Sequence, residues 1–313
     1  MRTNFRILET RALGIAAGLL LAAAGSAGTT AGNDFASTHA GRATVYEQIP
    51  EASLEELSSP DHILGIAAGN AAPTEIWRTL EHGEKVECLD CIGPVAKLLY
   101  DANPKTREIS AWWLRRRIFG VFGDGQVYSQ VQDALRNGST EEHRAYAAEA
   151  LGEFLVGSGV APVALAAVSD PSPMVRRSAV RALERLNHEG PGAELATAMG
   201  DQVEAVRLAA LEAAVHINVF SRLDAVVARL SDDSPDVRRR AAEVLGTMHA
   251  TDAVVGLMAL TAPEQEPDPR VRTAAVGALG RIADPSAHDA VAAAEADPDP
   301  LVRSIAHFSL RRL

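Results

Sequence analysis

Apolar and polar positions along this chain follow the period of an α-helix in short blocks, and one block returns every 31 to 37 residues. Each block has an arginine after a turn-prone stretch, a small residue three positions later and usually a leucine seven positions later. Around Arg176 these are Ala179 and Leu183, with Val175 just before the arginine. The seven repeat arginines are Arg107, Arg144, Arg176, Arg207, Arg238, Arg272 and Arg303. Positions −1, +3, +4 and +7 share one face of a helix, so each block predicts a helix that must pack against a neighbour.

A shorter apolar run with helical spacing precedes most blocks, such as Val254, Val255 and Leu257. The joints between the two runs are rich in Asp, Ser and Pro, which favour the first turn of a helix. The period therefore predicts an all-α fold, an α-solenoid of about seven two-helix repeats. Low aromatic content, 4% of the chain, agrees with thin helical layers.

The centre of the repeat, Asp-Pro followed by Val-Arg, then Ala at +3 and Ala-Leu at +6 and +7, resembles the short HEAT repeat also seen in bilin-lyase-type proteins. The resemblance covers roughly residues 90 to 313. In that family the repeat arginine and the aspartate before it hold the joints together through hydrogen bonds. The resemblance thus implies a structural role for the seven arginines. It leaves function open, because such solenoids serve many purposes.

The chain divides by composition into segments of different kinds. Residues 1–27 have three arginines before a short apolar run and small residues near Ala27, which is typical of a cleaved signal peptide. An uncleaved N-terminal anchor fits the same residues. Residues 28–58 read as a flexible linker, and residues 59–313 as the solenoid, with an N-terminal cap over 59–83 and the repeats over 84–313. We therefore expect an exported protein, periplasmic or extracellular.

The net charge of −11 argues against nucleic acid and anionic membranes as partners, and removing the signal peptide makes the chain more negative. No stable membrane insertion is expected after cleavage, because the apolar run is too short to span a bilayer. The protein is expected to be monomeric and to need no cofactor.

Cys88 and Cys91 are the two cysteines and precede the first full repeat. In an exported protein a local disulfide is the leading interpretation. A metal site would need two more ligands, for which His62 and His82 are near in sequence. Thiol-disulfide chemistry and free thiols remain open as well, since helix-terminal amides would stabilise a thiolate here.

The same segment holds Trp112 and Trp113. Trp113, at +6, is expected to be buried at the junction with the cap, whereas Trp112, at +5, is expected to be exposed. In HEAT-type solenoids the second helices line the concave face, so the resemblance places seven residues on or near one groove, and they are Trp112, Arg115, Arg116, Arg181, Arg185, Arg239 and Arg240. Several arginines there favour an acidic partner surface, against the alternative of a solvated helix face.

No catalytic constellation is present. The deoxyhypusine hydroxylases have HEAT repeats with recurring His-Glu pairs, and here only His188 is followed by a glutamate. Bilin lyases act in a cytoplasm, which conflicts with an export signal. We therefore expect no enzyme but an exported scaffold or adaptor that binds another protein through its concave face. The alternative is a periplasmic accessory to a redox or cofactor protein, using the Cys88/Cys91 pair.

Overall fold

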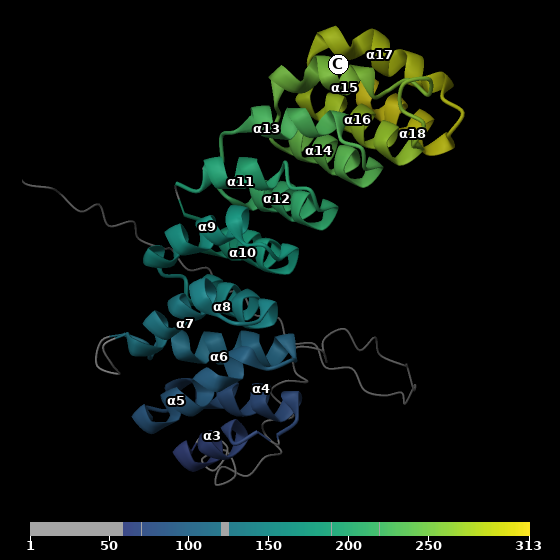
Figure 1. The fold of residues 1–313 in the computed structure, drawn as a ribbon. Coiled ribbons are helices and arrows are strands. Elements are labelled where there is room, and N and C mark those ends of the chain that lie inside the picture. Colours follow the sequence, from purple (N-terminus) through teal and green to yellow (C-terminus); the bar gives the residue numbers. More distant parts are fainter. Residues whose placement is uncertain (1–58, 70, 120–124, 189, 219) are drawn as a thin grey trace, which may run out of the picture. The chain divides into compact units, whose positions relative to one another are not determined.

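The computed structural model describes residues 59–69, 71–119, 125–188, 190–218 and 220–313, and in this part of the chain the regular elements are all helices. The predicted signal peptide and linker lie outside the described residues. The helices alternate between a first and a second helix of each repeat, and successive pairs stack on one another (Figure 1). The all-α solenoid predicted from the period is confirmed.

Each second helix begins at or just after its joint. The second helices are α6 (Pro104–Arg115), α8 (Glu141–Phe154), α10 (Pro173–Leu186), α12 (Glu204–His216), α14 (Pro235–Thr247), α16 (Pro269–Ile282) and α18 (Pro300–Leu310). The first helices are shorter, and they are α5 (Leu89–Lys97), α7 (Gln126–Asn137), α9 (Val160–Ser169), α11 (Gly192–Ala198), α13 (Leu223–Val227), α15 (Val254–Ala259) and α17 (His288–Ala293).

Caps explain where the second helices start. Ser172 accepts a hydrogen bond from the backbone N–H of Met174, and Pro173 occupies the first helical turn. Asp268 and Asp299 do the same before α16 and α18. A short polar side chain satisfies an N–H that has no partner inside the helix, and proline is already set to the helical φ.

Second helices also pack directly on the second helices before and after them. Small residues at +3, such as Ala241, are completely buried. The closest approach lies elsewhere, where a glycine at +8 meets a small residue at +6 of the next repeat. A Cβ atom added to Gly246 would lie 2.7 Å from the Cα of Ala278, and one on Gly152 would lie 2.8 Å from the Cα of Ala182. Glycine at these positions therefore sets the spacing between repeats.

The predicted cap consists of α3 (Pro60–Ala67) and α4 (Pro73–His82), followed by a 3₁₀ turn at Gly83–Lys85. It is more regular than expected. Helix α3 packs on α5 and α4 packs on α6, so the pair takes the place of one further hairpin in the stack (Figure 1). Ile63 and Leu80 are fully buried within it. None of the described helices combines the length and hydropathy needed to cross a membrane.

Candidate functional site

The repeat arginines link consecutive joints. Arg176 donates through Nη1 to the backbone oxygens of Asp170 and Pro171, at 2.9 and 3.1 Å, which closes its own joint. Its Nε and Nη2 donate to the carboxylate of Asp201 in the next joint, at 2.6 and 2.9 Å. Planar, bidentate pairing of this kind is what a guanidinium does well and an ammonium does not.

The same arrangement recurs along the chain. Arg144 pairs with Asp170, Arg238 with Glu266 and Arg272 with Asp297 through two hydrogen bonds each, and Arg207 reaches Asp232 through one at 2.8 Å. Each of these carboxylates also accepts the backbone N–H two residues further on. The side-chain donors of these arginines are used in hydrogen bonds at the joints, so they are not available to a ligand.

The pairing is visible in the pKa values of the partners. Burial alone would raise the pKa of Asp201, but the hydrogen bonds from Arg176 and from the backbone of Val203 outweigh it, and the pKa lies below its usual range. The pKa of Asp297 is lowered in the same way by Arg272 and the backbone of Asp299. Both carboxylates are therefore charged in the folded protein at neutral pH.

One joint departs from this pattern. Position 138, where the other joints supply the carboxylate, is a glycine, so Arg107 has no acid in the next joint to bind. Its Nε donates instead to Oε2 of Glu149 on α8, at 2.9 Å, and its guanidinium stacks 3.8 Å from the ring centroid of Tyr146. Arg107 therefore lies at the face of the stack that the second helices form.

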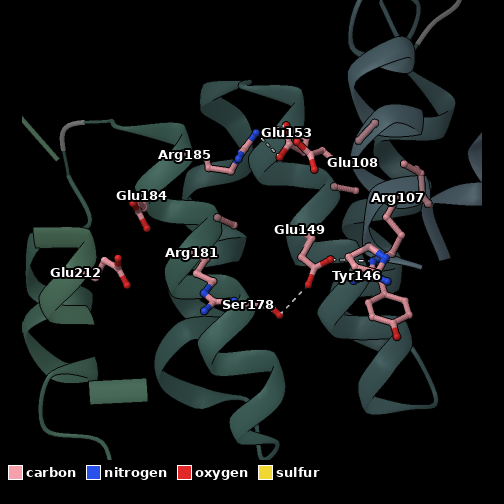
Figure 2. A pocket seen from close by; sticks show the side chains of 15 residues that line it. Arg107, Glu108, Tyr146, Glu149, Glu153, Ser178, Arg181, Glu184, Arg185 and Glu212 are labelled. Carbon is pink, nitrogen blue, oxygen red and sulfur yellow. Dashed lines mark hydrogen bonds and ion pairs between the residues drawn. The ribbon is translucent and has the colours of Figure 1, made fainter. Parts of the chain in front are cut away.

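A pocket of about 440 Å³ lies at this point, across α6, α8, α10 and α12 (Figure 2). We call it the central pocket. Ala111, Ala150 and Ala182 form part of its lining. Its charged lining residues are Glu108, Glu149, Glu153, Glu184 and Glu212, with Arg107, Arg181 and Arg185. Carboxylates thus outnumber guanidinium groups around this space.

Ion pairs and hydrogen bonds between repeats hold several of these side chains in place. Arg185 on α10 donates to Glu153 on α8 at 2.6 Å, and Ser178 donates to Oε1 of Glu149 at 3.3 Å (Figure 2). Glu153 has only 13% of its side chain exposed, and this burial raises its pKa against the opposing effect of Arg185. Glu184 contacts Nδ1 of His216 at 2.5 Å.

Two charged side chains of the pocket are free. Arg181 and Glu212 are exposed, and neither makes an ion pair or side-chain hydrogen bond to any residue in the described part of the chain. They occupy the same position, +5, on the neighbouring helices α10 and α12. Arg181 and Glu212 are therefore the charged groups of the central pocket that are available to another molecule.

The arginines predicted to lie on or near one groove do not all line the same pocket. Only Arg181 and Arg185 line the central pocket. Arg116 pairs with Glu84 at 2.7 Å, and Arg239 and Arg240 both pair with Glu243, at 2.6 and 3.3 Å. Arg115 is partly exposed on α6. The second-helix face is therefore mixed in charge and lacks the basic character that the expectation of an acidic partner assumed.

Trp112 corrects a second expectation. The sequence predicts an exposed side chain, but the indole is half-buried and packs against the core. Sequence reasoning also missed Tyr146, Glu149 and Glu153. The one signal that could have found them is Gly138, which breaks the series of joint acids and redirects Arg107.

Trp113 is fully buried, and its Nε1–H donates to the backbone oxygen of Gly83 at 2.8 Å, which ties the first repeat to the cap as predicted. Arg117, which the sequence did not single out, lies over the Trp113 ring at 3.8 Å. Its guanidinium donates to the backbone oxygens of Gly83, Glu84 and Val86. Burial, together with repulsion from Arg116, lowers its pKa to about 10. Arg117 thus caps the turn after α4.

Cys88 and Cys91 are joined, with a sulfur–sulfur distance of 2.03 Å, and both are buried. Cys88 is the N-cap of α5, and its sulfur accepts the N–H of Cys91 at 3.1 Å. Cys91 lies 3.7 Å from the backbone oxygen of Pro60, at the boundary with the cap. Within the described residues, no group of three or more His, Cys, Asp or Glu side chains is placed to hold a metal ion.

The family model for HEAT repeats matches residues 128–215 and 223–311, which is more than half of the chain. This chain is a HEAT-repeat protein. The match begins at residue 128, after the cap and the first two-helix repeat. No curated protein sequence matches the chain.

Solved structures share the HEAT-repeat fold at low sequence identity. The Escherichia coli protein YibA is 17% identical with a TM-score of 0.53, over 84% of this chain and 96% of that one. The structure of Kap95p with RanGDP gives 14% identity and a TM-score of 0.58, over 84% of this chain. Importin β gives 13% and 0.57, over 90%. This HEAT-repeat protein spans about half of each of the last two chains, at 48% and 49%.

Proposed function

We propose that this HEAT-repeat protein is an exported scaffold that binds another protein through its second-helix face, the concave face in this family, with the central pocket as its principal contact. The supporting observation is that Arg181 and Glu212 have no partner in the described part of the chain and line the same pocket as the mostly buried Glu153. The charges at the joints, by contrast, are paired within the chain. Protein binding also fits the fold, because the related Kap95p binds RanGDP.

The charge of the central pocket indicates the chemistry of the partner. Arg107 and Arg185 are paired with Glu149 and Glu153, which leaves three glutamates against Arg181 around the pocket. This excess of carboxylates favours a lysine or arginine side chain entering beside Glu212 and Glu184. Arg181 would then receive a carboxylate or backbone oxygen that follows in the same segment. The partner expected at this pocket is therefore basic rather than acidic.

Capture from the exported fraction, on immobilised protein, tests this function. Glu212→Lys and Arg181→Glu should each reduce the captured partner by about tenfold, because each reverses a free charge in the contact. Asp289→Lys on the first helix α17 and Arg136→Glu on the first helix α7 are matched controls, since both residues are exposed outside the pocket. Polylysine should compete with the partner, and polyglutamate should not.

Equal capture by the wild type and Glu212→Lys would contradict this function, and so would equal loss in the Asp289→Lys control. Competition by polyglutamate alone would still indicate protein binding, but it would show that the partner is acidic rather than basic. Thermal unfolding of each variant shows that a loss of capture does not come from a loss of fold.

Export is a separate part of the proposal. It rests on residues 1–27 and on a Cys88–Cys91 pair, since disulfides persist in oxidising compartments. The mature protein should have its N-terminus near Gly28 by mass spectrometry and should show no free thiol after unfolding without reductant. A full-length cytoplasmic form with two reactive thiols would overturn it.

A further inference from the structure

A second pocket lies between second helices at the C-terminal end of the stack, and its lining differs in chemistry from that of the central pocket. Between α16 and α18 it forms a groove of about 530 Å³, which we call the C-terminal groove. The residues that matter are Gly277 and Gly280 on α16, Ile305 and Phe308 on α18, and the arginines Arg281 and Arg312. Figure 1 shows these two helices side by side.

Equivalent repeat positions make the contrast with the central pocket direct. At +5 of the earlier helix, Glu149 is replaced by Gly277, and at +9, Glu153 is replaced by Arg281. On the later helix, Ser178 becomes Ile305 at +2, and Arg181 becomes Phe308 at +5. The same place on the surface thus changes from acidic and polar to apolar and basic.

The base of the C-terminal groove is apolar and open. Phe308 is 58% exposed and Ile305 is partly buried, and Leu301, one turn earlier on the same face of α18, is 57% exposed. Gly277 leaves room next to Ile305, since a Cβ atom added there would lie 3.5 Å from Cγ2 of that residue. One aliphatic or aromatic side chain of another molecule could lie in this space.

The rim is basic without compensation. Arg281 and Arg312 make no ion pair or side-chain hydrogen bond to any described residue, and no acidic residue lines the groove. Arg311 contacts Nε2 of His307 at 3.1 Å and lies 5.7 Å from the centre of the Phe308 ring, and the other ring nitrogen of His307 contacts Glu295 at 3.1 Å. In a chain with a net charge of −11, two arginines without a partner and a third without a direct ion pair, around an apolar base, are complementary to an acidic ligand.

We propose that the C-terminal groove is a second binding surface, which takes an acidic segment of a partner protein that carries one apolar anchor residue. The anchor lies between Gly277 and Phe308, and flanking carboxylates pair with Arg281, Arg311 and Arg312. This surface is separate from the central pocket and independent of its proposed function.

Three labelled peptides test the chemistry by fluorescence anisotropy with the full chain, and they are Glu-Glu-Phe-Glu-Glu, Lys-Lys-Phe-Lys-Lys and Glu-Glu-Ser-Glu-Glu. We expect measurable binding of the first alone, weakening as salt is raised. The double variant Arg281→Glu/Arg312→Glu should lose about tenfold or more in affinity. Gly277→Leu should also lose binding, because its side chain occupies the anchor space.

Arg136→Glu is the matched control, since Arg136 is an exposed arginine on the first helix α7, outside both proposed binding surfaces. It should leave affinity for Glu-Glu-Phe-Glu-Glu unchanged. Binding of the lysine peptide, equal binding of the serine peptide, or unchanged affinity in both groove variants would overturn the proposal. A dimer in sedimentation that Gly277→Leu dissociates would also overturn it, because a second copy would then occupy the groove.

Discussion

Arg272 and Asp297 join two repeats through a pair of hydrogen bonds of 2.8 and 2.9 Å, with 4% and 0% of their side chains exposed. Arg272 also closes its own joint by donating to the backbone oxygen of Glu266 at 2.9 Å. One side chain therefore fixes both the turn inside a repeat and the contact to the next.

Replacing Arg272 by methionine should destabilise the protein by about 3 to 5 kcal/mol, because Asp297 is left buried without its counter-ion. Urea unfolding measures the change. Arg270→Met is the control, since that arginine forms only exposed ion pairs, and its midpoint should stay close to the wild type. Equal midpoints for the two variants would mean that the buried pair does not support the fold.

Acid should weaken the joints. The pKa values of Asp201 and Asp297 are lowered in the folded state, so their contribution to stability is complete above the unfolded value of about 3.9 and is lost as the pH falls through the lower folded values. The stability difference between wild type and Asp297→Asn should therefore be constant near neutrality and should narrow below about pH 4. A difference that grows on acidification would contradict the assignment.

Two glycines on neighbouring helices should respond to alanine with opposite signs. Gly277→Ala has room and removes a residue of low helix propensity, so it should stabilise by about 0.5 to 1 kcal/mol. Gly246→Ala should destabilise by about 1 to 3 kcal/mol, because its Cβ would lie 2.7 Å from the backbone of Ala278. Thermal unfolding of both variants would test the proposed spacing between repeats.

The adjacent tryptophans give a further test. Trp113→Ala should cost about 3 to 5 kcal/mol, since it empties a fully buried site and removes the hydrogen bond to Gly83. Trp112→Ala should cost clearly less, because that side chain is only half-buried. Tryptophan fluorescence should support this assignment. Trp113→Ala should lose emission at shorter wavelength than Trp112→Ala does, because the Trp113 indole is the more buried of the two. A larger cost for Trp112→Ala would reverse the register of α6.

The repeat period predicted the fold because the same local rule acts seven times. A small residue at +3 in all seven repeats, and an apolar residue before the arginine in five of them, identify one helical face, so exceptions in single repeats do not hide the pattern. The register of Trp113 followed from the same rule, and so did the position of the second helices.

The central pocket could not be predicted in this way because it depends on an exception. The sequence shows Arg181 and Arg185, but the carboxylates that neutralise Arg185, Arg116 and Arg239 lie in other repeats or one turn away, and pairing is decided by rotamers rather than by spacing. The half-burial of Trp112 is likewise set by the neighbouring helices. In the sequence, the site is indicated only by Gly138, which stands where the other joints have an acidic residue.

That glycine also sets how the protein would respond to a pulling force applied at its ends. Most consecutive joints are connected by two short hydrogen bonds to one carboxylate. The link across position 138 has one hydrogen bond, from Arg107 to Glu149, and the stacking of Arg107 on Tyr146, and the Glu149 side chain is 36% exposed. Water can compete for that bond more readily than for the buried ones. Under tension the stack would therefore part first between its first and second repeats, which is where the central pocket begins.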